Sequence, residues 1–150
     1  MSLVSFFKGL SGPTYAVFLA RAMLGLVFFM AGWWKMFTLT PIAHAQRFFI
    51  EGFKEHWIPD WLLWPLGVVI PPFELVAGAA LLLGLWARFF ATTTGLLLLV
   101  TTYGHALQQP LFDIDGHTFT RLALAIFVLM LADAHDKLSL DHWRANRAGD

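Results

Sequence analysis

The sequence predicts an integral membrane protein of the all-α class: an antiparallel four-transmembrane-helix bundle with an amphipathic interfacial helix between the first two spans. Of its 150 residues, 58% are hydrophobic and only 13% are charged, whereas soluble domains have about 45–50% apolar and about 25% charged residues. Much of this apolar content lies in four stretches that approach the roughly 20 residues needed to cross a hydrocarbon core of about 30 Å. The bilayer is therefore the expected solvent for this chain.

We predict a single membrane domain over residues 1–150, with spans at about 14–36, 61–86, 88–107 and 117–133. Backbone polar groups have no water to bind in lipid, so each span is expected to be helical. The second span contains Pro65 and the pair Pro71-Pro72. A proline inside a helix removes a hydrogen bond, so we expect a kink or a break just before Glu74.

The segment between the first two spans, residues 40–59, is predicted to form the interfacial helix. Thr40-Pro41 is a favourable helix start, with a capping hydroxyl followed by a proline at the first helical position. Apolar side chains recur at helical spacing and charged residues fill much of the rest, as expected for a helix lying on a membrane surface. An ordinary extramembrane loop helix is the alternative. The apolar positions are Ile42, Ala45, Phe49 and Phe53.

Basic residues predict the orientation. An even number of spans places both termini on one side, together with Lys8, Arg88, Lys137, Arg144 and Arg147. The other side has one basic residue fewer: Lys35, Arg47, Lys54 and Arg121. Because basic residues favour the cytoplasmic side, we predict that both termini are cytoplasmic.

Composition also excludes several classes of function. The formal net charge is zero, so the basic face that nucleic-acid binding requires is not expected. The chain has no cysteine, which excludes disulfides and thiolate metal sites, and the spacing of its six histidines predicts no metal site. The serines lie only in the terminal segments, and we find no arrangement of nucleophile, base and acid, so a stand-alone enzyme is not expected.

Two charged residues fall deep inside the predicted spans, Arg21 in the first and Glu74 in the second. At about 1.5 Å per residue, Arg21 lies roughly 10 Å below the cytoplasmic boundary and Glu74 lies roughly 10–12 Å from the same boundary. Charges at this depth usually face the bundle interior, paired or functional. We therefore expect Arg21 and Glu74 to meet, either as a structural ion pair or as the lining of a polar pocket. Asp133 and Arg88 are further candidates for structural ion pairs at this end.

A second polar group is predicted near the opposite face, where Lys35, His105 and Arg121 lie. These side chains are either solvated at the interface or part of a ligand pocket. His105 is predicted about one turn inside its span. No second histidine is predicted at that depth, since the others fall in predicted loops or tails: His44, His56, His117, His135 and His142.

Four ordered motifs resemble the DoxX family. They are Arg21-Ala-Met-Leu-Gly25, Gly32-Trp-Trp-Lys35, Pro71-Pro-Phe-Glu74-Leu-Val-Ala-Gly78 and Leu83-Gly84-Leu-Trp-Ala-Arg88. The tail Lys137-Leu-Ser-Leu-Asp141 also resembles the end of that family. The resemblance implies a multi-pass, four-helix protein of the bacterial inner membrane, in which Arg21, Lys35, Glu74 and Arg88 match the characteristic charged positions.

The resemblance also implies a redox setting, because the family takes its name from a small subunit associated with a terminal quinol oxidase. We therefore expect an accessory membrane subunit of a respiratory or redox complex, with a membrane protein partner or a second copy of itself. No covalently bound cofactor is expected, and a quinone is the candidate ligand of the polar pocket. The alternatives are a lipid-binding or small-solute transport protein, and a structural assembly factor without a ligand.

Overall fold

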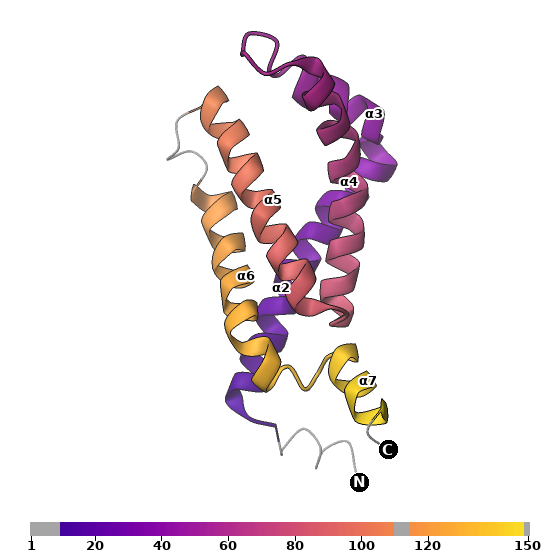
Figure 1. The fold of residues 1–150 in the computed structure, drawn as a ribbon, viewed down its shortest axis with the longest axis vertical. Coiled ribbons are helices and arrows are strands. Elements are labelled where there is room, and N and C mark those ends of the chain that lie inside the picture. The colour runs from indigo at the N-terminus through magenta and orange to yellow at the C-terminus, as the bar shows by residue number, and fades with distance from the viewer. Residues whose placement is uncertain (1–9, 110–114, 149–150) are drawn as a thin grey trace.

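The computed structural model describes residues 10–109 and 115–148, of which residues 115–117 and 148 are described by their backbone alone. Over these ranges the chain is helical and contains no strand (Figure 1). The helices in chain order are α2 (Gly12–Trp33), π-helix η1 (Trp34–Leu39), α3 (Pro41–His44), π-helix η2 (Ala45–Ile50), α4 (Asp60–Leu83), α5 (Ala87–Gln108), α6 (Asp115–His135) and α7 (Leu140–Ala148).

Three helical stretches among the described residues are long and apolar enough to cross a membrane: Gly12–Leu39, Asp60–Leu83 and Thr118–Arg147. They correspond to the first, second and fourth predicted spans. The third predicted span is the 22-residue helix α5, which is not one of the three. Five threonines and His105 make α5 more polar than the others.

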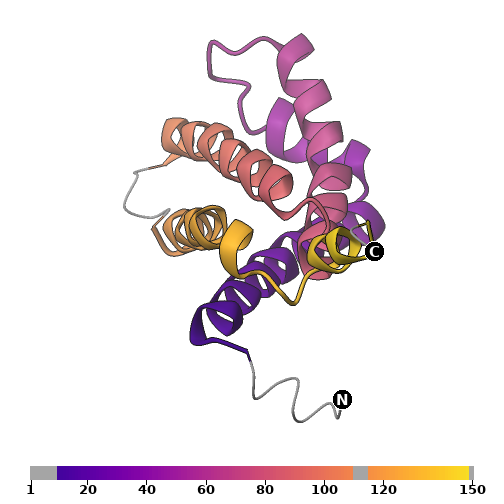
Figure 2. The ribbon, with the colours of Figure 1, turned by 60° about the horizontal axis from the view of Figure 1, so that its bottom comes forward.

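The long helices α2, α4, α5 and α6 alternate in direction and share one apolar core (Figure 1). Each of them contributes buried side chains to that core, among them Leu24, Leu81, Phe90 and Val128. Seen from the end at which α2 begins, α7 lies beside the end of α4 (Figure 2). The backbone N–H of Asp141 donates to the carbonyl of Gly84 there, at 3.0 Å, so α7 is tied to the turn between α4 and α5.

Glycines bring α2 and α4 into backbone contact. A Cβ on Gly25 would lie 2.7 Å from the backbone nitrogen of Leu82, and a Cβ on Gly78 would collide with the backbone of Phe29. Gly32 meets the backbone of Leu75 in the same way. Small residues at such positions allow transmembrane helices to approach closely. These contacts fix the antiparallel register of the two helices.

The prolines do not break the second span, because α4 continues from Asp60 to Leu83 with all three inside it. A proline has no N–H, so it leaves the carbonyl four residues earlier without its helical donor. For Pro71 that carbonyl belongs to Gly67. Its replacement donor comes from outside α4, as described below.

The segment between α2 and α4 folds onto the bundle. Thr40 caps α3 as predicted, with its hydroxyl accepting from the N–H of Ala43 at 3.3 Å. Ala45 and Phe49 lie against Gly67 of α4. Further along, the ring Nε2–H of His56 donates to the carbonyl of Leu107 on α5, at 2.9 Å. The segment therefore covers the side of the bundle where α4 begins and α5 ends.

We predict that Gly78→Ala lowers the thermal stability of the purified protein in detergent, because the added Cβ forces α2 and α4 apart. Gly95→Ala is the matched control, since a Cβ there meets nothing within 4 Å. Replacing a mid-helix glycine by alanine gains about 0.5–1 kcal/mol where space permits, so the control should be neutral or stabilising. Equal effects of the two substitutions on the unfolding temperature would contradict this packing.

Candidate functional site

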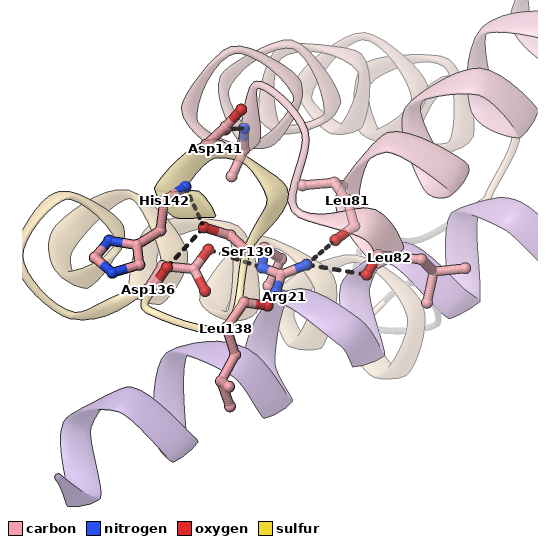
Figure 3. Close-up of polar contacts among 9 residues, drawn as sticks. Arg21, Leu81, Leu82, Asp136, Leu138, Ser139, Asp141 and His142 are labelled. Atoms are coloured by element: carbon pink, nitrogen blue, oxygen red, sulfur yellow. Dashed lines mark hydrogen bonds and ion pairs between the residues drawn. The ribbon is translucent and has the colours of Figure 1, made fainter. Parts of the chain in front are cut away.

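Arg21 forms a buried polar joint at the end of the bundle where α4 stops (Figure 3). Its side chain is fully buried. The guanidinium Nε lies 2.8 Å from Asp136 Oδ2. One terminal nitrogen donates to the carbonyls of Leu81 and Leu82, and the other donates to the carbonyl of Leu138 at 2.9 Å. All three nitrogens of Arg21 are therefore engaged by the protein.

This joint satisfies the exposed end of α4. The last carbonyls of a helix have no intrahelical partner, and Arg21 supplies donors and a positive charge where the helix dipole is negative. Gly84 ends α4 in the left-handed conformation, with φ of 68°. A Cβ at Gly84 would also lie 2.9 Å from the guanidinium carbon of Arg21. Glycine is required there for its conformation and for this close approach.

The tail after α6 completes the joint. Ser139 Oγ donates to the carbonyl of Asp136 at 2.6 Å and accepts from the N–H of His142 at 3.2 Å. Asp141 Oδ2 accepts from the N–H of Ala87 at 3.0 Å, which caps the first turn of α5. The Arg21 joint thus links α2, α4, α5 and the tail, and its arginine side chain is fully buried among them.

The predicted pairing of Arg21 with Glu74 is wrong. The glycine contacts place Glu74 level with Gly32, which lies eleven residues beyond Arg21 on α2, or roughly 16 Å along the axis at about 1.5 Å per residue. Arg21 instead lies level with the end of α4. Our depth estimate counted from assumed span boundaries, and it missed that α4 begins well beyond the last turn of α2.

Glu74 pairs with Lys35 instead. The Lys35 ammonium donates to both carboxylate oxygens of Glu74, at 2.8 and 2.6 Å. Glu74 is buried and Lys35 is half-buried. An ion pair that satisfies both partners is the usual way to hold a charge inside a bundle. It brings together two of the predicted pocket residues, from η1 and α4.

A cavity of about 270 Å³ lies beside this pair. Aromatic rings from the η1 and η2 segments and the following turn form much of its wall: Trp34, Phe48, Phe49 and Phe53. Its polar lining consists of Lys35, His44, Thr101, His105 and Gln108. We call this space the Lys35 cavity. It joins an apolar wall to a few polar groups, as small-molecule sites do.

His44 is one of the residues of the Lys35 cavity that our sequence reasoning missed, together with Thr101 and Gln108. It lies in α3, is buried, and lines the same cavity as His105. Its Nδ1 is 2.7 Å from the carbonyl of Gly67, the carbonyl that Pro71 leaves without a donor. A proline four residues after a glycine was the available signal for this contact.

The electrostatics of His44 follow from this position. Burial lowers the pKa of His44 below its usual range, and the positive charge of Lys35 lowers it further. The hydrogen bond to Gly67 raises the pKa; its effect is smaller than that of burial and larger than that of Lys35. His44 is therefore neutral near pH 7.

The backbone around the Lys35 cavity is unusual. Lys35 lies in η1, and Phe48 and Phe49 lie in η2. π-Helical turns are rare in proteins, and those that occur are often found at functional sites. Thr40 between them has φ of 74°, which is an outlier for a β-branched residue. Such backbone strain clusters at functional sites. Two independent features of the backbone thus mark the same region as the polar lining.

The remaining predicted residues lie elsewhere. Arg88 pairs with Asp133 at 2.5 Å, but both side chains are more than 60% exposed, so this pair contributes at most about 1 kcal/mol. Arg121 is half-buried on α6 and forms no ion pair with any residue that the structure describes. Its charge acts on Glu74 only through space.

A larger hollow of about 490 Å³ lies beside α7. Its acidic residues are already engaged: Asp133 by Arg88, Asp136 by Arg21 and Asp141 by the start of α5. No group of three or more potential metal ligands occurs among the residues described. The Lys35 cavity is therefore the candidate functional site.

A family model describing DoxX matches residues 16–106. The chain belongs to the DoxX family. The match includes Arg21, Lys35, Glu74 and Arg88, and with the apolar helices it identifies a membrane protein. The searches of curated proteins and of solved structures returned no significant match. In this DoxX protein the matched charges thus divide between the Arg21 joint, the Lys35 cavity and an exposed pair.

We predict that Arg21 and Asp136 are energetically coupled. Removing one partner of a buried pair leaves the other uncompensated, typically at about 3–5 kcal/mol. Arg21→Met and Asp136→Leu should each lower the unfolding temperature strongly, and the double variant should lose less than the sum. In the matched cycle, Arg21→Met and Glu74→Leu should be additive. If instead Arg21 and Glu74 were coupled while Arg21 and Asp136 were additive, the partners of Arg21 would be assigned wrongly.

Proposed function

We propose that this protein is a four-span accessory subunit of a redox complex in the bacterial inner membrane, and that it holds a quinone or a related lipid-soluble ligand in the Lys35 cavity. The observation that carries the proposal is the cavity itself, where an apolar aromatic wall meets Lys35 and a neutral histidine. Membership of the DoxX family supports the redox setting.

The residues of the cavity fit a single-ring head group. Its volume of about 270 Å³ lies just below the roughly 300–1,000 Å³ of most small-molecule pockets. Lys35 can donate to a ring oxygen, and the phenylalanine rings can pack against the face of the head group. A bound quinone would supply the electron-transfer chemistry. The chain would bind the head group, orient it and shield it from water.

The proposal includes α5 as the fourth crossing. Its threonines are its main polar residues, and several bond to the preceding turn: Thr93 to the carbonyl of Phe89 at 2.9 Å, Thr94 to that of Phe90 at 2.7 Å and Thr101 to that of Leu97 at 3.1 Å. A hydroxyl satisfied within its own helix costs little in lipid. Four crossings would place both termini on one side, which we propose is cytoplasmic.

The outer face of α6 supports an accessory role. Only 11% of the apolar 18-residue stretch in this candidate span is buried in the bundle, whereas the corresponding shares are 39% and 44% for the other two candidate spans. Phe119, Ile126 and Met130 are exposed along this helix. We propose that a membrane protein partner, or a second copy of the chain, packs here.

Labelling should test the crossings, since the chain has no cysteine to remove. Single cysteines are placed at Lys54 before α4, at Gln109 after α5 and at Arg144 in α7. We expect Lys54→Cys and Gln109→Cys to react with an impermeant maleimide from the outer side, and Arg144→Cys from the cytoplasm. Gln109→Cys and Lys54→Cys reacting from different sides would show that α5 does not cross.

Binding should be tested with a photoreactive, decyl-tailed benzoquinone on the protein in nanodiscs. We expect crosslinks on Trp34, Phe48 or His105, displaced by the unmodified quinone. Thr101→Phe should fill the cavity and reduce labelling severalfold. Thr92→Phe is the matched control, because Thr92 is an exposed position of the same helix. Labelling along the outer faces of α5 and α6 that Thr101→Phe leaves unchanged would contradict the proposed function.

A further inference from the structure

The hydrogen bond between α3 and α4 fixes the tautomer of His44. Pro71 has no N–H, so the carbonyl of Gly67 lacks its helical donor, and His44 Nδ1 lies 2.7 Å from that oxygen. A carbonyl oxygen only accepts, so the proton of the bond must be on Nδ1. In a neutral imidazole the other nitrogen, Nε2, then carries a lone pair.

That lone pair faces no acidic hydrogen of the protein. Nε2 lies on the side of the ring away from Gly67, and the ring lines the Lys35 cavity. Among the residues that the structure describes, the bond to Gly67 is the hydrogen bond that the His44 ring makes. The rings of Phe48 and Phe49 pack against the His44 ring, each at a centroid distance of 5.4 Å. The cavity therefore contains a preoriented hydrogen-bond acceptor.

We infer that the Lys35 cavity selects a ligand whose aromatic ring carries a hydroxyl, a phenol or a hydroquinone, and that this hydroxyl donates to Nε2 of His44. The inference rests on the proposed function and specifies it: the reduced form of the head group is the form that is bound more tightly.

The other polar groups at the cavity favour the same ligand class. Lys35 is neutralised by Glu74 through two hydrogen bonds, so a carboxylate or a phosphate would find no spare positive charge there. An ammonium has three donors, and the one that remains can serve a second ring oxygen. The aromatic wall of Trp34, Phe48 and Phe49 favours a ring over an aliphatic alcohol.

The test compares two probes of the same size, a decyl-tailed hydroquinone and its oxidised benzoquinone, bound under anaerobic conditions to the protein in nanodiscs. Only the hydroquinone has an O–H to donate. One hydrogen bond corresponds to roughly 2- to 10-fold in affinity, so the hydroquinone should displace the photoreactive probe at a correspondingly lower concentration.

His44→Asn should abolish this preference while the protein stays folded, because the asparagine amide nitrogen can still donate to the carbonyl of Gly67, whereas the amide oxygen is bonded directly to Cγ and does not reach the position of Nε2. His56→Gln is the matched control. It changes another histidine whose ring donates to a carbonyl, but one that does not line the cavity. The preference should survive in His56→Gln.

Three results would overturn the inference. Equal affinity of the wild-type protein for the two probes would refute it without any variant and would leave the proposed function intact. An unchanged preference in a folded His44→Asn protein would refute the role of His44. Failure of both probes to bind the wild-type protein would refute the proposed function itself, and the inference with it.

Discussion

The backbone contact between α2 and α4 determines which charged groups meet in this protein. Gly25, Gly32 and Gly78 leave no room for a Cβ, so the two helices have one antiparallel register. That register places Lys35 beside Glu74 and Arg21 beside the free carbonyls at the end of α4. In a low-dielectric interior each of these charges needs a partner, so a shift of the register by one turn would leave several groups unsatisfied at once.

The two ends of the bundle use their polar groups differently. At the Arg21 joint, each guanidinium nitrogen has a protein partner and the tail closes over it, which is the arrangement of a structural element. At the Lys35 cavity, the proline-freed carbonyl of Gly67 is satisfied by His44, and that histidine lines the cavity. Buried polar groups are normally satisfied. An oriented acceptor beside a cavity therefore points to a ligand rather than to stability.

Sequence patterns predicted most of the fold and part of the site. Three spans follow from hydropathy and length, and the start of α3 follows from Thr40-Pro41. Lys35 and His105 were predicted to lie in one polar group, and both line the cavity. The partner of Arg21 was not predicted, because counting residues from assumed boundaries cannot give a register that close glycine contacts determine. The burial of His44 against α4 was not predicted, because nothing local shows that its segment folds back onto α4.

Pro71 connects the backbone of α4 to the chemistry of the cavity. A proline in a transmembrane helix is usually considered for the kink it produces, yet α4 is unbroken and the larger consequence is chemical. A proline leaves the carbonyl four residues earlier without its helical donor, and a neighbouring segment can supply a replacement. In this protein the donor at Gly67 is an imidazole, whose two nitrogens are linked by tautomerism. Satisfying the backbone on one side of the ring therefore creates an acceptor on the other. The constraint that stabilises α4 thus also determines the chemistry of the cavity.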